Sequence, residues 1–82
     1  MGTMIKSINT EKYQELVNWL KAERLAKGLS VRELALIIDE PFQFISKIET
    51  AQRKLNIYEY VQYCEALKLE ATEGLAILAK NK

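Results

Sequence analysis

The sequence has no histidine and a single cysteine, Cys64. An intrachain disulfide is therefore impossible, which fits a reduced, cytoplasmic setting. The usual zinc sites, a thiolate–imidazole pair and a serine triad all need side chains that the sequence lacks. Paired carboxylates are present, but a helical chain of 82 residues offers little pocket to hold them. We therefore expect no enzyme activity, no metal site and no cofactor.

Residues that interrupt helices are also scarce. Proline occurs once and glycine three times, whereas Leu, Ile, Ala, Glu and Lys are frequent, which favours helix throughout. No run approaches the roughly 20 apolar residues of a membrane-spanning helix, and residues 1–9 lack the apolar stretch of a signal peptide. Hydrophobic residues make up 49% of the chain, enough for a folded core. We expect an all-α fold of five helices, with residues 1–82 forming a single domain.

Charge is nearly balanced, with a formal net charge of +1. The distribution is informative because residues 41–56 carry Lys47, Arg53 and Lys54 against Glu49. Residues 1–40 are balanced, and residues 57–82 carry one excess negative charge. A small basic excess in the middle of the chain is the weak electrostatic signal of a nucleic-acid-binding protein.

The first two helices are marked by capping residues. Thr10 is a plausible N-cap for the first helix, and Gly28 is a plausible stop. The core face of this helix follows helical spacing and comprises Tyr13, Leu16, Val17 and Leu20. Ser30 and Glu33 match a capping box, which opens a second helix at about residues 31–38. Its buried stripe is Leu34, Ala35 and Ile38.

The third helix is expected at about residues 41–50, with Pro41 at its first position, where a missing N–H costs nothing. Ile45 and Ile48, with Phe44, should point inward. The opposite, outer face comprises Phe42, Gln43, Ser46, Lys47 and Thr50.

The last two helices complete the core. Asn56 and Glu59 form a capping-box-like start for a fourth helix. Its expected inner stripe is Ile57, Tyr60, Val61, Cys64 and Leu67. A fifth helix is expected at about residues 71–80, with Leu75, Leu78 and Ile77 as its apolar residues.

Two short helices joined by a tight turn, the second with a polar outer face, are typical of a helix-turn-helix. The residues that carry a more specific pattern are Leu34-Ala35-x-x-Ile38-Asp39-x-Pro41-x-x-x-Ile45-Ser46-Lys47-Ile48-Glu49, followed by Arg53-Lys54-Leu55 and Glu65-Ala66-Leu67. Without a gap, this stretch resembles the signature of the phage Cro/repressor (XRE-type) helix-turn-helix family. The second helix of such a motif enters the major groove of DNA.

The resemblance implies roles for individual residues. The base contacts would come from Phe42 to a thymine methyl group, Gln43 to adenine and Lys47 to guanine. The phosphate contacts would come from Arg32, Ser46, Thr50, Arg53 and Lys54. Arg24, a charge on or beside the core face of the first helix, needs a partner. The resemblance implies that this partner is Glu49, in an ion pair that braces the recognition helix.

The sequence departs from the family pattern in and around the turn. Asp39 stands where the family usually has glycine, and we expect it to adopt the positive φ of that position, which Asp tolerates better than most residues. Asp39 and Glu40 place two negative charges beside the start of the recognition helix. Leu36 and Ile37 occupy positions that are usually charged and exposed. They either pack under Trp19 or the last helix, or form an additional apolar contact surface.

Two functional hypotheses remain open. The first is a transcriptional regulator, a repressor that binds a palindromic operator as a homodimer, with recognition helices about 34 Å apart. The dimer interface would involve Leu55, Leu75 and Leu78. The second is a protein-binding module on the same fold, such as an antitoxin or an anti-regulator, which contacts a protein partner through Leu36 and Ile37.

Overall fold

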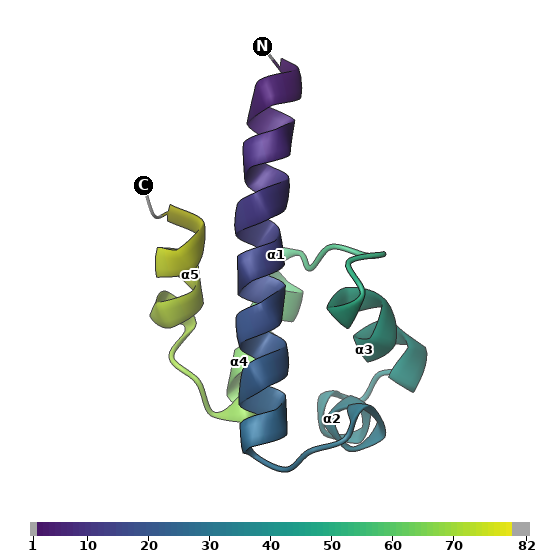
Figure 1. The fold of residues 1–82 in the computed structure, drawn as a ribbon. Coiled ribbons are helices and arrows are strands. Elements are labelled where there is room, and N and C mark those ends of the chain that lie inside the picture. Colours follow the sequence, from purple (N-terminus) through teal and green to yellow (C-terminus); the bar gives the residue numbers. More distant parts are fainter. Residues whose placement is uncertain (1, 80–82) are drawn as a thin grey trace.

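In a computed structural model, the backbone is described for residues 2–79 and the side chains for residues 11–79. The described chain consists of five α-helices and contains no strand, which confirms the predicted all-α architecture. The helices are α1 (Gly2–Ala26), α2 (Val31–Ile38), α3 (Phe42–Glu49), α4 (Ile57–Leu67) and α5 (Ala71–Ala79) (Figure 1). The predicted end of the last helix, Lys80, lies outside the described residues.

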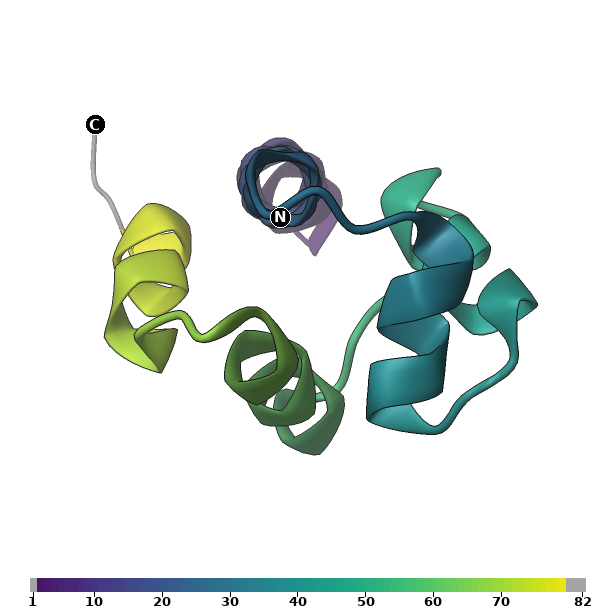
Figure 2. The same cartoon turned by 90° about the horizontal axis from the view of Figure 1, so that it is seen from below.

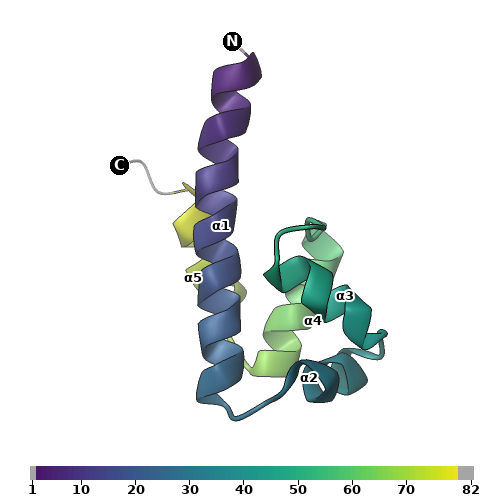
Figure 3. The ribbon, with the colours of Figure 1, turned by 45° about the vertical axis from the view of Figure 1, so that its right-hand side comes forward.

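The first helix is longer than the sequence indicated. It begins at Gly2, so Thr10 lies within α1 and is not its N-cap. The prediction was wrong because no proline or glycine separates Thr3 from Thr10, and nothing breaks the helix there. The N-terminal part of α1 extends beyond the other helices (Figures 1 and 3). This extension makes the molecule elongated, with principal extents of 40 × 23 × 20 Å.

The hydrophobic core lies where α1, α2, α3 and α4 meet, and Figure 2 shows α2 between α3 and α4. The buried hydrophobic residues are Leu16, Val17 and Leu20 of α1, Leu34 and Ala35 of α2, Ile45 and Ile48 of α3, and Tyr60, Tyr63, Cys64 and Leu67 of α4. Each fully buried large aliphatic side chain contributes about 1.5–3 kcal/mol relative to exposure. The predicted inward faces of α1, α2 and α3 are therefore the faces that hold the fold together.

The predicted inner stripe of α4 is wrong at two positions. Ile57 is 68% exposed and Val61 is 38% exposed, whereas Tyr63 is fully buried. The stripe instead follows Tyr60, Tyr63, Cys64 and Leu67, at the spacing i, i+3, i+4, i+7. Val61 is turned away because each residue rotates the side chain by about 100° around the helix axis.

The helix starts follow local capping chemistry. The Ser30 hydroxyl accepts from the Glu33 N–H at 3.0 Å, and the Glu33 carboxylate accepts from the Ser30 N–H at 2.8 Å. Asn56 and Glu59 form the same reciprocal pair at the start of α4. Both predicted capping boxes are confirmed. Pro41, however, is the N-cap of α3 and not its first helical residue, because its ψ of 152° is extended.

Four helices end in the same way, with one residue in the left-handed conformation. These residues are Gly28, Asp39, Ala51 and Lys68, with φ values of 71°, 69°, 60° and 60°. The next N–H along the chain then bonds to a carbonyl in the last turn, as in Leu29 to Arg24, Glu40 to Ala35, Gln52 to Lys47, and Leu69 to Cys64. Asp39 thus adopts the positive φ expected of it. At Ala51 and Lys68 the Cβ makes this conformation costlier than it is at glycine.

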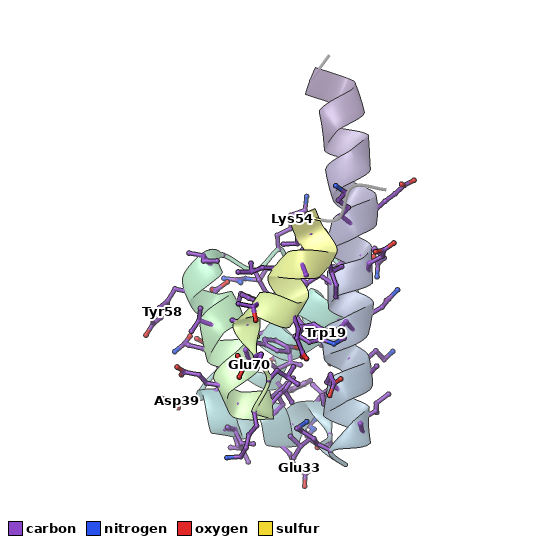
Figure 4. The ribbon with its side chains drawn as sticks, turned by 90° about the vertical axis from the view of Figure 1, so that its left-hand side faces the viewer. Trp19, Glu33, Asp39, Lys54, Tyr58 and Glu70 are labelled. Atoms are coloured by element: carbon purple, nitrogen blue, oxygen red, sulfur yellow. The ribbon has the colours of Figure 1, made fainter. Side chains whose placement is uncertain are left out.

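The last helix packs on α1 through a glycine. A Cβ on Gly74 would lie 2.8 Å from both Leu16 Cδ1 and Trp19 Cζ3, so no larger residue fits without a shift. Trp19 lies beside the first part of α5 (Figure 4). The Tyr60 hydroxyl of α4 donates to the Ala71 carbonyl, which fixes the start of α5.

Candidate nucleic-acid interface

The outward side of α3 is the surface that the helix-turn-helix frame presents. Ile45 and Ile48 are fully buried against α2 and the core. On the opposite side, Gln43 and Lys47 are exposed and lie one turn apart, so both side chains reach solvent from the same face. We call the set Phe42, Gln43, Ser46, Lys47 and Thr50 the α3 outer face. Ser46 is half-buried, and the other four residues are exposed.

The recognition helix is tied to α1 by a buried ion pair. Arg24 Nε and Nη2 donate to the two carboxylate oxygens of Glu49 at 2.6 and 2.9 Å, and Nη1 donates to the Leu29 carbonyl at 2.7 Å. Both charged side chains are only 7% exposed. The hydrogen bonds to Glu49 raise the pKa of Arg24 above its ordinary value, against the opposing effect of burial. This pair joins the end of α1, the α1–α2 loop and the end of α3.

Phe42 and Arg32 are held together at the start of α3. The Arg32 guanidinium carbon lies 4.1 Å from the centroid of the Phe42 ring, a cation–π contact between α2 and α3. Phe42 is therefore partly covered, at 36% exposure, but it still presents part of its ring to solvent. The stacked guanidinium keeps its in-plane N–H groups available for a phosphate.

The two basic residues after α3 are also held by aromatic rings. Arg53 lies over the ring of Phe44, at 4.7 Å, and donates from Nη1 and Nη2 to the Glu59 carboxylate at 2.8 and 2.9 Å. The hydrogen bonds from Arg53 lower the pKa of Glu59 below its ordinary value. Arg53 therefore already has a carboxylate partner, which a phosphate would have to share. Lys54 Nζ lies 5.7 Å from the centroid of the Tyr13 ring.

The C-terminal end of the α3 outer face is fixed by its own hydrogen bonds. The Thr50 hydroxyl donates to the Ser46 carbonyl at 2.8 Å, and Gln52 Nε2 donates to the Thr50 hydroxyl at 2.9 Å. Thr50 thus retains limited capacity to bond a phosphate. The structure places it at the end of the face, one turn beyond Ser46.

Tyr13 positions the loop after α3, whereas the sequence indicated only a core role for this residue. The Tyr13 hydroxyl donates to the Arg53 carbonyl at 3.1 Å and accepts from the Leu55 N–H at 3.2 Å. Partial burial raises the pKa of this hydroxyl above its ordinary value. No local signal could have revealed the role, because the partners lie about 40 residues away in the chain.

The three residues of the predicted dimer interface differ in burial. Leu55 and Leu78 are half-buried and pack against the core. Leu75 of α5 is 41% exposed, so it is the member of this set that offers most surface to another molecule.

The end of α2 carries an exposed apolar pair. Leu36 is 81% exposed and Ile37 is 53% exposed, so neither is covered by Trp19 or by α5. Of the two alternatives left open by the sequence, the exposed surface is therefore the one observed. The acidic residues Asp39 and Glu40 follow directly and are also exposed.

The described residues contain neither a membrane-spanning helix nor a metal-binding cluster. Within residues 2–79, no helix is long and apolar enough to cross a membrane. In the same part of the chain, no three Cys, Asp or Glu side chains gather in a way that could hold a metal ion.

Comparisons with known proteins agree with this geometry. A helix-turn-helix family model matches residues 20–73, a span that includes all of α2, α3 and α4. Among solved structures, the chain is similar to an XRE-family-like protein from Pseudomonas syringae pv. tomato. The two sequences are 32% identical, the match covers 93% of each chain, and the TM-score is 0.86. No curated protein matches the chain.

Proposed function

The chain belongs to the Cro/repressor (XRE) type of helix-turn-helix family, a family of DNA-binding domains and not of enzymes, and from this premise we propose that it is a sequence-specific DNA-binding regulator. Residues 1–82 act as one cytoplasmic domain, and α3 is the helix that enters the major groove. The observation that carries the proposal is the pair Gln43 and Lys47, exposed one turn apart on a helix whose other side is buried.

The bases are read by the first two turns of α3. Gln43 can bond bidentately to adenine, Lys47 can donate to guanine, and the free part of the Phe42 ring can contact a thymine methyl group. A well-formed bidentate contact discriminates against the wrong base by about 1–3 kcal/mol. The buried pair of Arg24 with Glu49 supports this reading because it limits how α3 can shift relative to α1.

The phosphates are bound around the edges of this surface. Arg32 lies at the start of α3, whereas Thr50, Arg53 and Lys54 lie at its end, so the two groups flank the base-reading residues along α3. Ser46 lies between them on the same face. Contacts of this kind position the protein on the duplex without reading its sequence.

The proposed active form is a homodimer that represses from a palindromic operator. Two copies related by a two-fold axis place their α3 helices in successive major grooves, about 34 Å apart. The exposed Leu75 of α5 supports an interface at this helix, which also carries the half-buried Leu78, whereas Leu55 lies in the loop after α3.

The test is selection of bound duplexes from a random DNA pool at two salt concentrations, followed by sequencing. We expect an enriched palindrome whose half-sites lie one helical turn apart and whose binding weakens steeply with salt. Gln43→Ala and Lys47→Ala should abolish the enrichment. The matched controls Gln14→Ala and Lys21→Ala, on the solvent side of α1, should leave it unchanged. Folded wild-type protein that enriches no sequence would refute the proposal.

A second candidate function is a protein-binding module of the antitoxin or anti-regulator kind. The specific observation in its favour is the 81% exposure of Leu36, next to the exposed Ile37, on a helix position where an apolar side chain gains nothing from the fold. This candidate predicts that Leu36→Asp leaves the fold intact and abolishes partner binding, whereas Gln43→Ala and Lys47→Ala leave partner binding unchanged.

A further inference from the structure

A shallow groove is lined by residues of α2 and α4. Its volume is about 250 Å³, and its lining residues are Ile37, Ile38, Gln62, Glu65 and Ala66. Leu36 precedes Ile37 in the chain and is 81% exposed, but it is not among the lining residues. The groove therefore offers a mixed surface, with aliphatic side chains from Ile37, Ile38 and Ala66 and polar side chains from Gln62 and Glu65.

The surroundings of the groove are acidic. Glu65 forms part of its wall, and Asp39 and Glu40 follow its α2 residues directly in the chain. The Glu33 carboxylate is not among them, because it accepts from the Ser30 N–H at the other end of α2. The single basic residue of α2, Arg32, is engaged with the Phe42 ring and belongs to the α3 side.

This charge pattern decides between the possible occupants. Nucleic acid is repelled by these three carboxylates, and a second copy placed symmetrically would bring the same acidic rim against this one. An amphipathic helix that sets aliphatic side chains against Ile37 and Ala66, and Lys or Arg against Glu65 and the carboxylates after α2, matches this mixed lining. We propose that the α2–α4 groove binds a cationic amphipathic helix of another protein. The inference rests on the second candidate function and names its partner's chemistry.

The α3 outer face is not part of this groove. The lining residues come from α2 and α4, whereas Gln43 and Lys47 lie on α3, with α2 between the two surfaces (Figure 2). A partner helix in the groove therefore leaves the base-reading residues free, and the complex with DNA and the complex with protein can coexist.

The probe is a synthetic fluorescein-labelled leucine–lysine peptide that forms an amphipathic helix, with binding followed by fluorescence anisotropy. A peptide of the same pattern with glutamate for lysine, and a scrambled leucine–lysine peptide, serve as references. We expect binding of the cationic amphipathic peptide and no binding of either reference.

Two pairs of variants test the site. Ile37→Ser should weaken binding about fivefold through lost apolar contact, whereas Ile57→Ser, at an exposed isoleucine outside the groove, should not change it. Glu65→Lys should weaken binding at least as much, whereas Glu70→Lys, at an exposed linker residue, should have a small effect. Thermal unfolding of each variant checks that the fold is intact.

Several results would overturn the inference. Equal effects of Ile37→Ser and Ile57→Ser, or of Glu65→Lys and Glu70→Lys, would mean that the peptide is attracted only by general charge. Binding of the glutamate peptide that Ile37→Ser abolishes would keep the second candidate function but refute the cationic partner. If no peptide binds at millimolar concentration, the groove is not a docking site. That result would leave the proposed DNA binding by α3 untouched, because the duplex selection tests it independently.

Discussion

Replacement of Glu49 by leucine should be among the most destabilising single substitutions in this chain. It would leave the Arg24 guanidinium, 7% exposed, with the Leu29 carbonyl but without its carboxylate. Removing one partner of a buried ion pair typically costs about 3–5 kcal/mol. A domain of this length has a total free energy of unfolding of about 4–12 kcal/mol. Glu49→Leu should therefore remove a large share of the stability and lower the melting temperature by at least about 12 °C.

The assay is urea denaturation followed by far-UV circular dichroism, with thermal melting alongside. The matched control is Glu23→Gln, because Glu23 pairs with Lys27 at 3.5 Å on the same helix but both side chains are about one-third exposed. That change should cost no more than about 0.5 kcal/mol.

A double variant tests the reasoning itself. In Arg24→Met/Glu49→Leu no buried charge remains, so most of the lost stability should return, although the Leu29 carbonyl loses its donor. If Glu49→Leu alone costs less than about 1 kcal/mol, or if the double variant is no more stable than the single one, the buried pair does not brace α3 as described.

Three other changes test separate contacts. Tyr63→Phe should raise the free energy of unfolding by about 1 kcal/mol, and the urea midpoint with it, because the buried Tyr63 hydroxyl has no hydrogen-bond partner among the described residues. A loss of stability would show that the hydroxyl does have a partner. Gly74→Ala should lower stability by about 2 kcal/mol, since its Cβ meets Leu16 and Trp19, and an unchanged melting temperature would contradict the close approach of α5 to α1. The hydrogen bonds from Arg53 lower the pKa of Glu59 from its ordinary value of 4.5. The stability that this pair contributes is therefore present above pH 4.5 and is lost as the pH falls through the lowered pKa of the folded state. Glu59→Gln should therefore flatten the decline in melting temperature on the acid side, and a parallel decline in both proteins would exclude this pair as a cause.

The parts of the fold that could be predicted from the sequence depend on residues close together in the chain. Ser30 with Glu33, and Asn56 with Glu59, form capping boxes within one helical turn, and both are present. The exposure of Val61 could not be predicted, because local spacing fits more than one stripe on α4. Which stripe is buried depends on where α2 and α5 pack against α4, and these contacts join distant parts of the chain.

The candidate site shows the same division more sharply. The alternation on α3 indicated Ile45 and Ile48 inside and Gln43 and Lys47 outside, and the structure has them there. The partner of Arg24 came from the resemblance to a family, since nothing within α1 identifies Glu49.

The contacts of the remaining arginines could not be read from the sequence. Arg32 stacks on Phe42 across the turn, and Arg53 bonds to Glu59 across a loop. Side chains of this length have many possible partners, and the choice is made only once the backbone brings the helices together.

The acidic turn between α2 and α3 bears on how the protein searches a genome. Attraction to DNA of arbitrary sequence depends on how many phosphates a protein neutralises. This chain has a net charge of +1 and places Asp39 and Glu40 directly before the helix proposed to enter the groove. A regulator of the proposed kind would therefore gain little from DNA outside its operator, and such DNA would compete weakly for it. Occupancy of an operator depends on the ratio of specific to non-specific affinity. Carboxylates that weaken both affinities by the same factor leave this ratio unchanged. They nevertheless reduce the number of molecules bound to DNA of arbitrary sequence.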